Sequence, residues 1–337
     1  MTGRFLIKEI ALQAGVSTAT VDRVLNDRGG VRERTVARVR HAIAELEHQG
    51  AWTAVRGQRF VIDILVEAPR IFLNVLRAAM DEEIAMSRLG VFQLRRDMRP
   101  AFPADEMART MHQIARRGSD GVIVMGPVSD LVREAIAALD NAGVPVITLT
   151  TDIPGSARRA YVGLDNHRAG MTAAWFMRKW VQGGSPHVIV TMRNLAFRGE
   201  NERRDGFVST MHRHFDTPKI SILVESPDRR DIAEQVRRTL VRSPEVCGFY
   251  SVGGSNLEIL DAVRGMDRTP GAYVAHDLDD ENIELMRSGR IDVLIYHDLR
   301  EDVRNALRSL MSIRSKGRIP PPPDGAALRV MVPPMCP

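Results

Sequence analysis

Short apolar runs alternate with helical stretches from Val61 onward, and this alternation constrains the fold more than any other feature of the sequence. The runs are short and rich in β-branched residues, as in VIDILVE (61–67) and GVIVM (121–125). Strands that alternate with helices form parallel sheets with helices on both faces. The pattern therefore predicts an α/β fold with doubly wound parallel sheets.

The predicted strands fall into two consecutive sets, the second of which begins after Asp152. The first set is VIDILVE (61–67), VFQL (91–94), GVIVM (121–125) and PVITL (145–149); the second is YVGL (161–164), HVIVTM (187–192), KISILVE (219–225), GFYSV (248–252), AYVAH (272–276) and DVLIY (292–296). Ligands of such sheets bind beyond the carboxyl ends of the strands. The two sets therefore indicate two lobes with a ligand cleft between them.

The first 50 residues carry a different pattern. Apolar residues recur at helical spacing over 7–14, Gly15 breaks the period, and Ser17 is a favourable N-cap for a second helix. A third helix is predicted from about 32 to 48. Two short helices with a glycine between them, braced by a third, form a helix-turn-helix whose second helix fits a DNA major groove. A small bundle that only covers one end of a larger domain is the other interpretation.

Charge favours the DNA-binding interpretation. Residues 1–60 contain ten Lys and Arg and six Asp and Glu, so this segment carries +4 of the chain's net charge of +5. Positive charge gathered on one small module is typical of proteins that bind the phosphate backbone of nucleic acids.

The run IKEIALQAGVSTATVDRVLN, followed by VRERT and AIAEL, resembles the DNA-binding head of lactose-repressor-type (LacI/GalR) regulators. The resemblance implies a homodimer on a near-palindromic operator of double-stranded DNA. It also implies which residues face the DNA: Thr18, Ala19 and Arg23 to read bases, and Ser17, Thr20 and Asn26 to hold phosphates or brace the helix. Chemistry supports Arg23 independently, because a guanidinium can pair bidentately with guanine.

Three positions depart from the family's wording. Asp22 stands where the family usually has Ser, and its carboxylate either faces Arg23 or Arg28 or repels a phosphate. Gly50 and Ala51 stand where the family has the Pro-Asn of its hinge.

We expect a hinge or linker over 51–60. Trp52, Arg56 and Arg59 could replace the usual minor-groove contact, since apolar wedges and arginines both suit that groove. A flexible linker without DNA contact is the alternative.

Several later runs resemble the family's ligand-sensing core, which is itself similar to periplasmic ribose-type binding proteins. These runs are YVGLDN (161–166), ERRDGF (202–207), YSVGGSN (250–256), VAHD (274–277) and LIYHD (294–298). The resemblance implies a lobe 1 of about 61–162 and 297–320 and a lobe 2 of about 163–296 and 321–337. It implies effector contacts at Arg70, Phe72, Asp152, Arg203, Asn256, Asp277 and His297.

The residue types suit a polyol, because hydroxyl groups need both donors and acceptors, and Arg203 and Asp277 supply them. Structural roles stay open for three of the residues. Arg203 could pair with Asp205, Asp277 could cap a helix that starts near Asp279, and His297 could be a satisfied core histidine.

Arg70 occupies the position at which ribose-type binders usually have Asn, and it lies close to Phe72 in the sequence. A cation at that position favours an anionic effector such as a sugar acid or sugar phosphate.

Enzyme and transport functions find little support in the sequence. No G-x-G-x-x-G follows the first strand, and no H-x-x-x-H, C-x-x-C, G-x-S-x-G or P-loop run occurs. Two cysteines, Cys247 and Cys336, define neither a disulfide framework nor a metal cluster. We therefore expect no catalytic residue, cofactor or metal. An α/β enzyme fused to a DNA-binding head remains an alternative.

The N-terminus lacks an apolar signal segment and no 18 consecutive residues are apolar, so we expect a cytoplasmic, nucleoid-associated protein without membrane contact. The expected organisation is a DNA-binding domain at 1–50, a hinge at 51–60 and an effector-binding domain at 61–337. The expected function is transcriptional repression controlled by a small effector (a sugar, polyol or sugar acid), with an effector-dependent activator or co-repressor-type regulator as the alternative.

Overall fold

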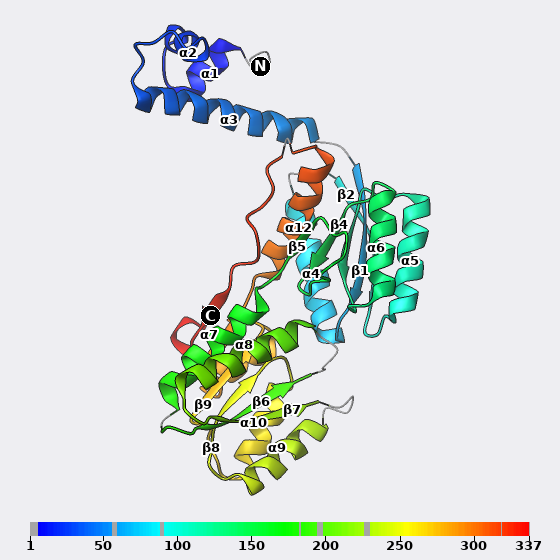
Figure 1. Ribbon diagram of the computed structural model, residues 1–337, viewed down its shortest axis with the longest axis vertical. Coiled ribbons are helices and arrows are strands. Elements are labelled where there is room, and N and C mark those ends of the chain that lie inside the picture. Colours follow the sequence, from blue (N-terminus) through cyan, green and yellow to red (C-terminus); the bar gives the residue numbers. More distant parts are fainter. Residues whose placement is uncertain are drawn as a thin grey trace.

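The computed structural model describes residues 6–55, 59–87, 91–181, 183–193, 198–225, 230–317 and 319–336. A small helical head lies at one end of the long axis, followed by two sheet-containing lobes (Figure 1). Among the described residues, no helix combines the length and the apolar composition needed to cross a membrane.

Lobe 1 contains a five-stranded parallel sheet of order β2-β1-β3-β4-β5. Its strands are β1 (Arg59–Glu67), β2 (Val91–Arg99), β3 (Gly121–Met125), β4 (Val146–Leu149) and β5 (Ala160–Val162). Its helices are α4 (Arg70–Met86), α5 (Ala104–Arg117), α6 (Asp130–Asn141) and α12 (Leu299–Arg314). Apolar residues of α4 and α12 pack on one face of the sheet, and those of α5 and α6 pack on the other.

The run YVGL was expected to begin the second sheet, and that expectation is wrong. Its strand, β5, pairs in parallel with β4 and completes the first sheet. After Leu149 a loop leads the chain back to the amino end of β4, so that β5 can run parallel to it. There the Arg159 amide donates to the Val146 carbonyl. An apolar run specifies a strand, but it does not specify which neighbour the strand pairs with.

Lobe 2 contains a six-stranded sheet of order β11-β10-β9-β8-β6-β7, parallel except for the antiparallel pair β10 and β11. Its strands are β6 (His187–Met192), β7 (Lys219–Val224), β8 (Val246–Ser251), β9 (Ala272–His276), β10 (Val293–Tyr296) and β11 (Arg329–Met331). Its helices are α7 (Asn166–Trp180), α8 (Arg198–His214), α9 (Arg230–Arg242), α10 (Asn256–Arg264) and α11 (Asp280–Arg287), and a 3-10 turn covers Pro333–Met335. Helices α7 and α8 cover one face, and α9, α10 and α11 cover the other.

The head consists of α1 (Ile7–Ala14), α2 (Thr18–Leu25) and α3 (Glu33–Val55), packed around Ile10, Val21 and Val39. Helix α3 runs seven residues beyond its expected end at His48, into the expected hinge. The physical reason is that no proline precedes Pro69, so no residue removes a helical N–H or clashes with the preceding turn. Gly50 lowers helix stability by only about 1 kcal/mol relative to Ala.

Candidate effector cleft and nucleic-acid interface

A cleft of about 700 Å³ lies between the lobes at the carboxyl ends of the strands. Helix α4 and the start of α12 line it from lobe 1, and the segments after β6, β8, β9 and β10 line it from lobe 2. This volume falls within the range of small-molecule sites, roughly 300–1,000 Å³. Of the residues expected to contact an effector, Phe72, Asn256, Asp277 and His297 line the cleft.

Asp277 follows β9 with a backbone φ of 71°, in the left-handed region that non-glycine residues seldom adopt. Its amide donates to the Ile295 carbonyl of the neighbouring strand. Ser255, which also lines the cleft, has a φ of 52°. Such backbone strain is concentrated at functional sites, because only the surrounding structure can hold it. Asp277 does not cap α11; that role belongs to Asp279, which accepts from the Asn282 amide.

Arg203 is buried behind Asp277, with its Nη1 4.0 Å from an Asp277 carboxylate oxygen. Its guanidinium donates to Asn166 Oδ1 at 2.8 Å and to the Val252 carbonyl at 3.1 Å. The pairing with Asp205 that the sequence left open is made by Arg204. Arg203 is not part of the cleft lining, but it belongs to a buried network behind Asp277 rather than to the helix surface.

Two glycines allow α8 to bring Arg203 to this place. A Cβ on Gly170 of α7 would lie 1.8 Å from the Arg203 carbonyl oxygen, and a Cβ on Gly206 would lie 2.0 Å from the His167 carbonyl oxygen. Neither space admits a side chain, so the two helices can approach this closely only with glycine at both positions. The glycines that follow YVGLDN and ERRD are thus explained by helix packing.

His297 lines the cleft and is held from behind by Asp302, a residue that sequence reasoning missed. The hydrogen bond between His297 Nδ1 and the Asp302 carboxylate fixes the orientation of the imidazole ring. His276 lies deeper, with its Nε2 2.7 Å from the Tyr250 hydroxyl. Burial, together with the nearby Arg203 and His297, lowers the pKa of His276 well below its usual range, so this ring is neutral at pH 7.

The remaining expected contacts have other surroundings. Asn256 has its amide occupied, because it donates to Asn282 and accepts from the Tyr273 hydroxyl. Asp152 is bound to Arg158 near the crossing between the lobes and is not part of the cleft lining.

Arg70 is an exposed residue at the start of α4 and likewise lies outside the cleft lining. A different cation, Arg193, lines the cleft after β6, and its guanidinium packs against Gly254, where a Cβ would come within 2.1 Å of Nη2. No motif in the sequence pointed to Arg193.

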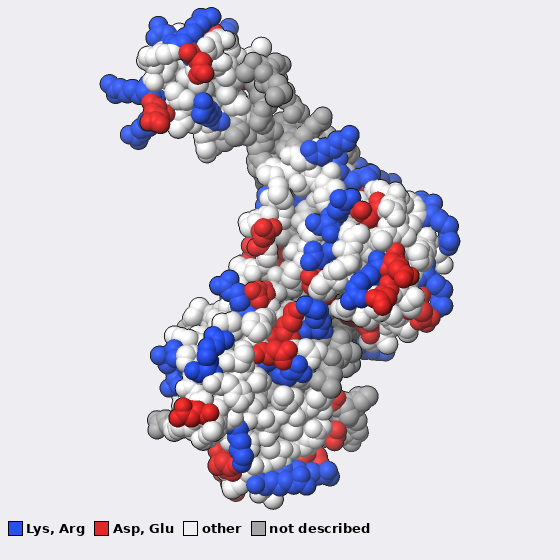
Figure 2. Space-filling view, viewed as in Figure 1, with Lys and Arg blue, Asp and Glu red and all other residues white. Residues whose placement is uncertain are grey.

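The second helix of the head, α2, presents a polar face to solvent. Thr18, Ala19 and Arg23 are exposed, while Val21 on the opposite side is fully buried in the head's core. Ser17 caps the helix by accepting from the Thr20 amide at 3.2 Å, and its hydroxyl is also 2.8 Å from the Thr20 hydroxyl. Blue Lys and Arg side chains project from several sides of the head in Figure 2.

The Asp22 carboxylate is shared by two neighbours. Asn26 donates to one of its oxygens at 2.8 Å, and Arg28 donates to the other at 3.0 Å. Of the open alternatives for Asp22, the structure has the pairing with Arg28. Arg23 is thereby left without this carboxylate as a partner.

Arg59 is the one expected hinge residue whose side chain the structure describes. It begins β1, and its guanidinium donates to Gln93 Oε1 at 2.6 Å. The Trp52 side chain and all of Arg56 lie outside the described residues.

Arg38 ties helix α3 to the turn between α1 and α2. From α3 it donates to the Ala14 carbonyl at 2.8 and 3.2 Å and to the Gly15 carbonyl at 2.8 Å, at the end of α1 where carbonyls lack helical partners.

We expect Arg38→Ala to destabilise the head by about 1–2 kcal/mol, since charged hydrogen bonds to carbonyls would be lost at a partly exposed site. Hydrogen exchange of the α1 and α2 amides measures this change. Arg40→Ala, an exposed position of the same helix, is the control. Equal protection in the two variants would contradict the assignment.

Comparison with known proteins agrees with this division into parts. Residues 6–49 match the family model of bacterial regulatory proteins of the lacI family, and residues 91–318 match that of the periplasmic binding protein domain. The chain is 23% identical over 210 residues to the HTH-type transcriptional repressor PurR of Actinobacillus pleuropneumoniae (61% of this chain and 60% of the relative). It is 31% identical over 153 residues to the maltose regulon regulatory protein MalI of Escherichia coli (43% and 42%).

The match thus spans about three fifths of PurR and less of MalI. Among solved structures, a putative LacI transcriptional regulator from Bacteroides fragilis superposes with a TM-score of 0.72 at 15% identity, over 82% of this chain and 98% of that one. At that identity the likeness concerns the fold. The chain belongs to the proteins built on a periplasmic binding protein domain, and its head is that of the lacI family of bacterial regulatory proteins.

Proposed function

We propose that the chain is a sequence-specific transcription regulator, a repressor whose affinity for operator DNA is controlled by a small carbohydrate-like effector. One observation carries the proposal: the same chain has an exposed polar face on α2 and a cleft lined by Asp277 and His297. The head offers Arg23 for base recognition, and the cleft offers acceptor groups for hydroxyls. The proposed role is regulatory and not enzymatic.

The proposal includes a homodimer at the nucleoid in the cytoplasm. One three-helix head buries too little DNA surface for tight specific binding, and two heads on a near-palindromic operator double it. The lobes supply the surfaces through which two chains would associate.

An experiment in two steps tests the proposal. Selection from random DNA should yield a near-palindromic site, and sedimentation of that site with the chain should give two chains per duplex. Thermal-shift screening of sugars, polyols and sugar acids should then find a stabilising ligand, since a ligand raises apparent stability by mass action. Failure to enrich any sequence, or monomers on the selected site, would refute the regulator as proposed.

A second candidate is a co-repressor-type regulator that senses a sugar acid or sugar phosphate. Its basis is Arg193, because a guanidinium can pair with an anionic group of a ligand, although six carboxylates and three arginines line the cleft. An operator titration with the ligand found above separates the two: release of DNA supports the first candidate, and tighter binding supports the second.

A further inference from the structure

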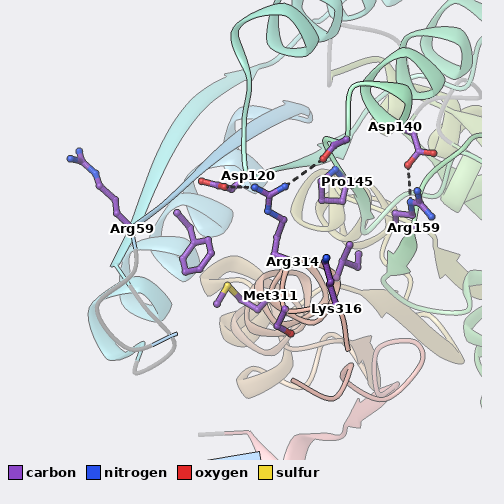
Figure 3. Close-up of a pocket in the computed structure, with 12 residues that line it drawn as sticks. Arg59, Asp120, Asp140, Pro145, Arg159, Met311, Arg314 and Lys316 are labelled. Carbon is purple, nitrogen blue, oxygen red and sulfur yellow. Dashed lines mark hydrogen bonds and ion pairs between the residues drawn. The ribbon is translucent and has the colours of Figure 1, made fainter. Parts of the chain in front are cut away.

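A second cavity, of about 710 Å³, lies at the end of lobe 1 opposite the effector cleft. It is bounded by the amino ends of β1, β3, β4 and β5 and by the carboxyl end of α12. Figure 3 shows its lining residues, with Arg314 between Asp120 and Pro145, and Lys316 beside them. The cavity borders Arg59, the first described residue after the head.

The charges of this cavity do not cancel. Four cations line it (Arg59, Arg159, Arg314 and Lys316) against two carboxylates (Asp120 and Asp140), which leaves an excess of two positive charges.

Both carboxylates are already engaged. Asp120 accepts from the Val61 amide at 2.8 Å and from Arg314 at 2.9 Å. Asp140 accepts from Arg159 at 2.7 Å.

The two remaining cations have no acidic partner in the part of the chain that the structure describes. Arg59 binds the neutral amide of Gln93. Lys316 is exposed, and its ammonium makes no hydrogen bond or ion pair with any described residue. Its backbone φ of 55° is left-handed, and the turn is fixed by the Lys316 and Gly317 amides, which donate to Ile313 and Ser312.

The rest of the lining is apolar. Phe60 and Met311 are buried, and Pro145 lies beside them. The space is larger than an inorganic anion requires, so a ligand would combine an anionic group with a body that can pack on apolar surface.

From the excess charge and the apolar floor, we propose that this cavity binds a small phosphomonoester, its dianionic phosphate at Lys316 and its organic part on Phe60 and Met311. Lysine binds phosphate as a compact charge, and the Lys316 ammonium has no carboxylate partner among the described residues to compete with it. This site is separate from the effector cleft and does not depend on what binds there.

The test is titration calorimetry of the full chain with three probes: inorganic phosphate, glucose 6-phosphate and AMP. Glucose and adenosine are the matched controls without phosphate. We expect at least one organic phosphate to bind and its unphosphorylated counterpart not to bind. Absence of binding by all three phosphates at concentrations of about 10 mM, where even weak affinities register, would overturn the proposal.

Variants then locate the site. Lys316→Gln keeps an unbranched polar side chain, one atom shorter, and removes its charge, and we expect about 10-fold weaker binding of the phosphate. Lys316→Glu should abolish it. Lys179→Gln, at an exposed lysine of lobe 2, is the matched control and should not change it. Equal affinities of the Lys316→Gln and Lys179→Gln proteins would overturn the proposal.

Two further measurements distinguish this cavity from the effector cleft and from a DNA-binding surface. In hydrogen exchange, we expect the ligand to protect amides over 311–317. Protection confined to 277–282 would place the phosphate in the effector cleft and overturn the proposal. A Lys316→Gln protein that binds the small phosphates normally but loses affinity for operator and random DNA alike would make Lys316 a contact to the DNA backbone, which also overturns it.

Discussion

Replacing Arg203 with alanine is expected to lower the affinity of the chain for its effector by about 100-fold, because each hydrogen bond lost from a buried charged group costs roughly 1.5–3 kcal/mol. Arg203 lies 4.0 Å from Asp277 and fixes Asn166 and the Val252 carbonyl. Without it, the Asp277 carboxylate loses a cation at 4.0 Å, and the buried network behind Asp277 loses its donor. We expect the effector response at the operator to disappear.

Arg204→Ala is the matched control, since this neighbour pairs with Asp205 away from the cleft. It should keep the response, whereas Asp277→Ala should lose it as Arg203→Ala does. Operator binding without effector should stay within a few fold in all three, which an operator titration with and without effector measures. A full response in the Arg203→Ala protein would show that the effector binds elsewhere.

Replacing Arg23 with alanine is expected to cost about 1–3 kcal/mol at the preferred operator and to remove base preference at one position of each half-site. Arg23 is exposed on α2, and the nearby carboxylate of Asp22 is bound to Arg28, so its guanidinium is available to a base edge. The measurement compares affinities for the selected operator, for operators changed one base pair at a time, and for random DNA.

Arg28→Ala is the control, because it removes one positive charge just after the end of α2. Arg28 is paired with Asp22 and is not expected to read a base. It should weaken binding to operator and random DNA by similar factors. If Arg23→Ala behaved in that same way, Arg23 would be a phosphate contact and its assignment to base reading would be wrong.

The sequence predicted the α/β fold class and the helix-turn-helix because both depend on local periodicity. Strand neighbours depend on tertiary packing, which is why β5 was assigned to the wrong sheet. The end of α3 was also predicted too early. The family's hinge implied a break after His48, but this chain has no proline there to end the helix.

Asp277 and His297, which the family resemblance places among the effector contacts, lie after β9 and β10 and line the cleft. The positions of Arg70 and Asp152 outside the cleft lining were harder to predict. A residue at the start of a helix can face either way, and Asp152 is engaged by Arg158, six residues along the chain. That local opposite charge could have signalled the pairing. Asp302, five residues after His297, is a similar signal.

The unbroken course of α3 sets how the head can meet DNA. Its 23 residues form a rod of about 34 Å. Strand β1 begins four positions after the last residue of this helix, so the two elements can lie at most about 14 Å apart. An added base pair between two half-sites displaces one of them by about 3.4 Å and turns it by about 35° around the duplex. A rod cannot absorb such a turn within itself, so for the proposed dimer we expect a narrow range of operator spacer lengths.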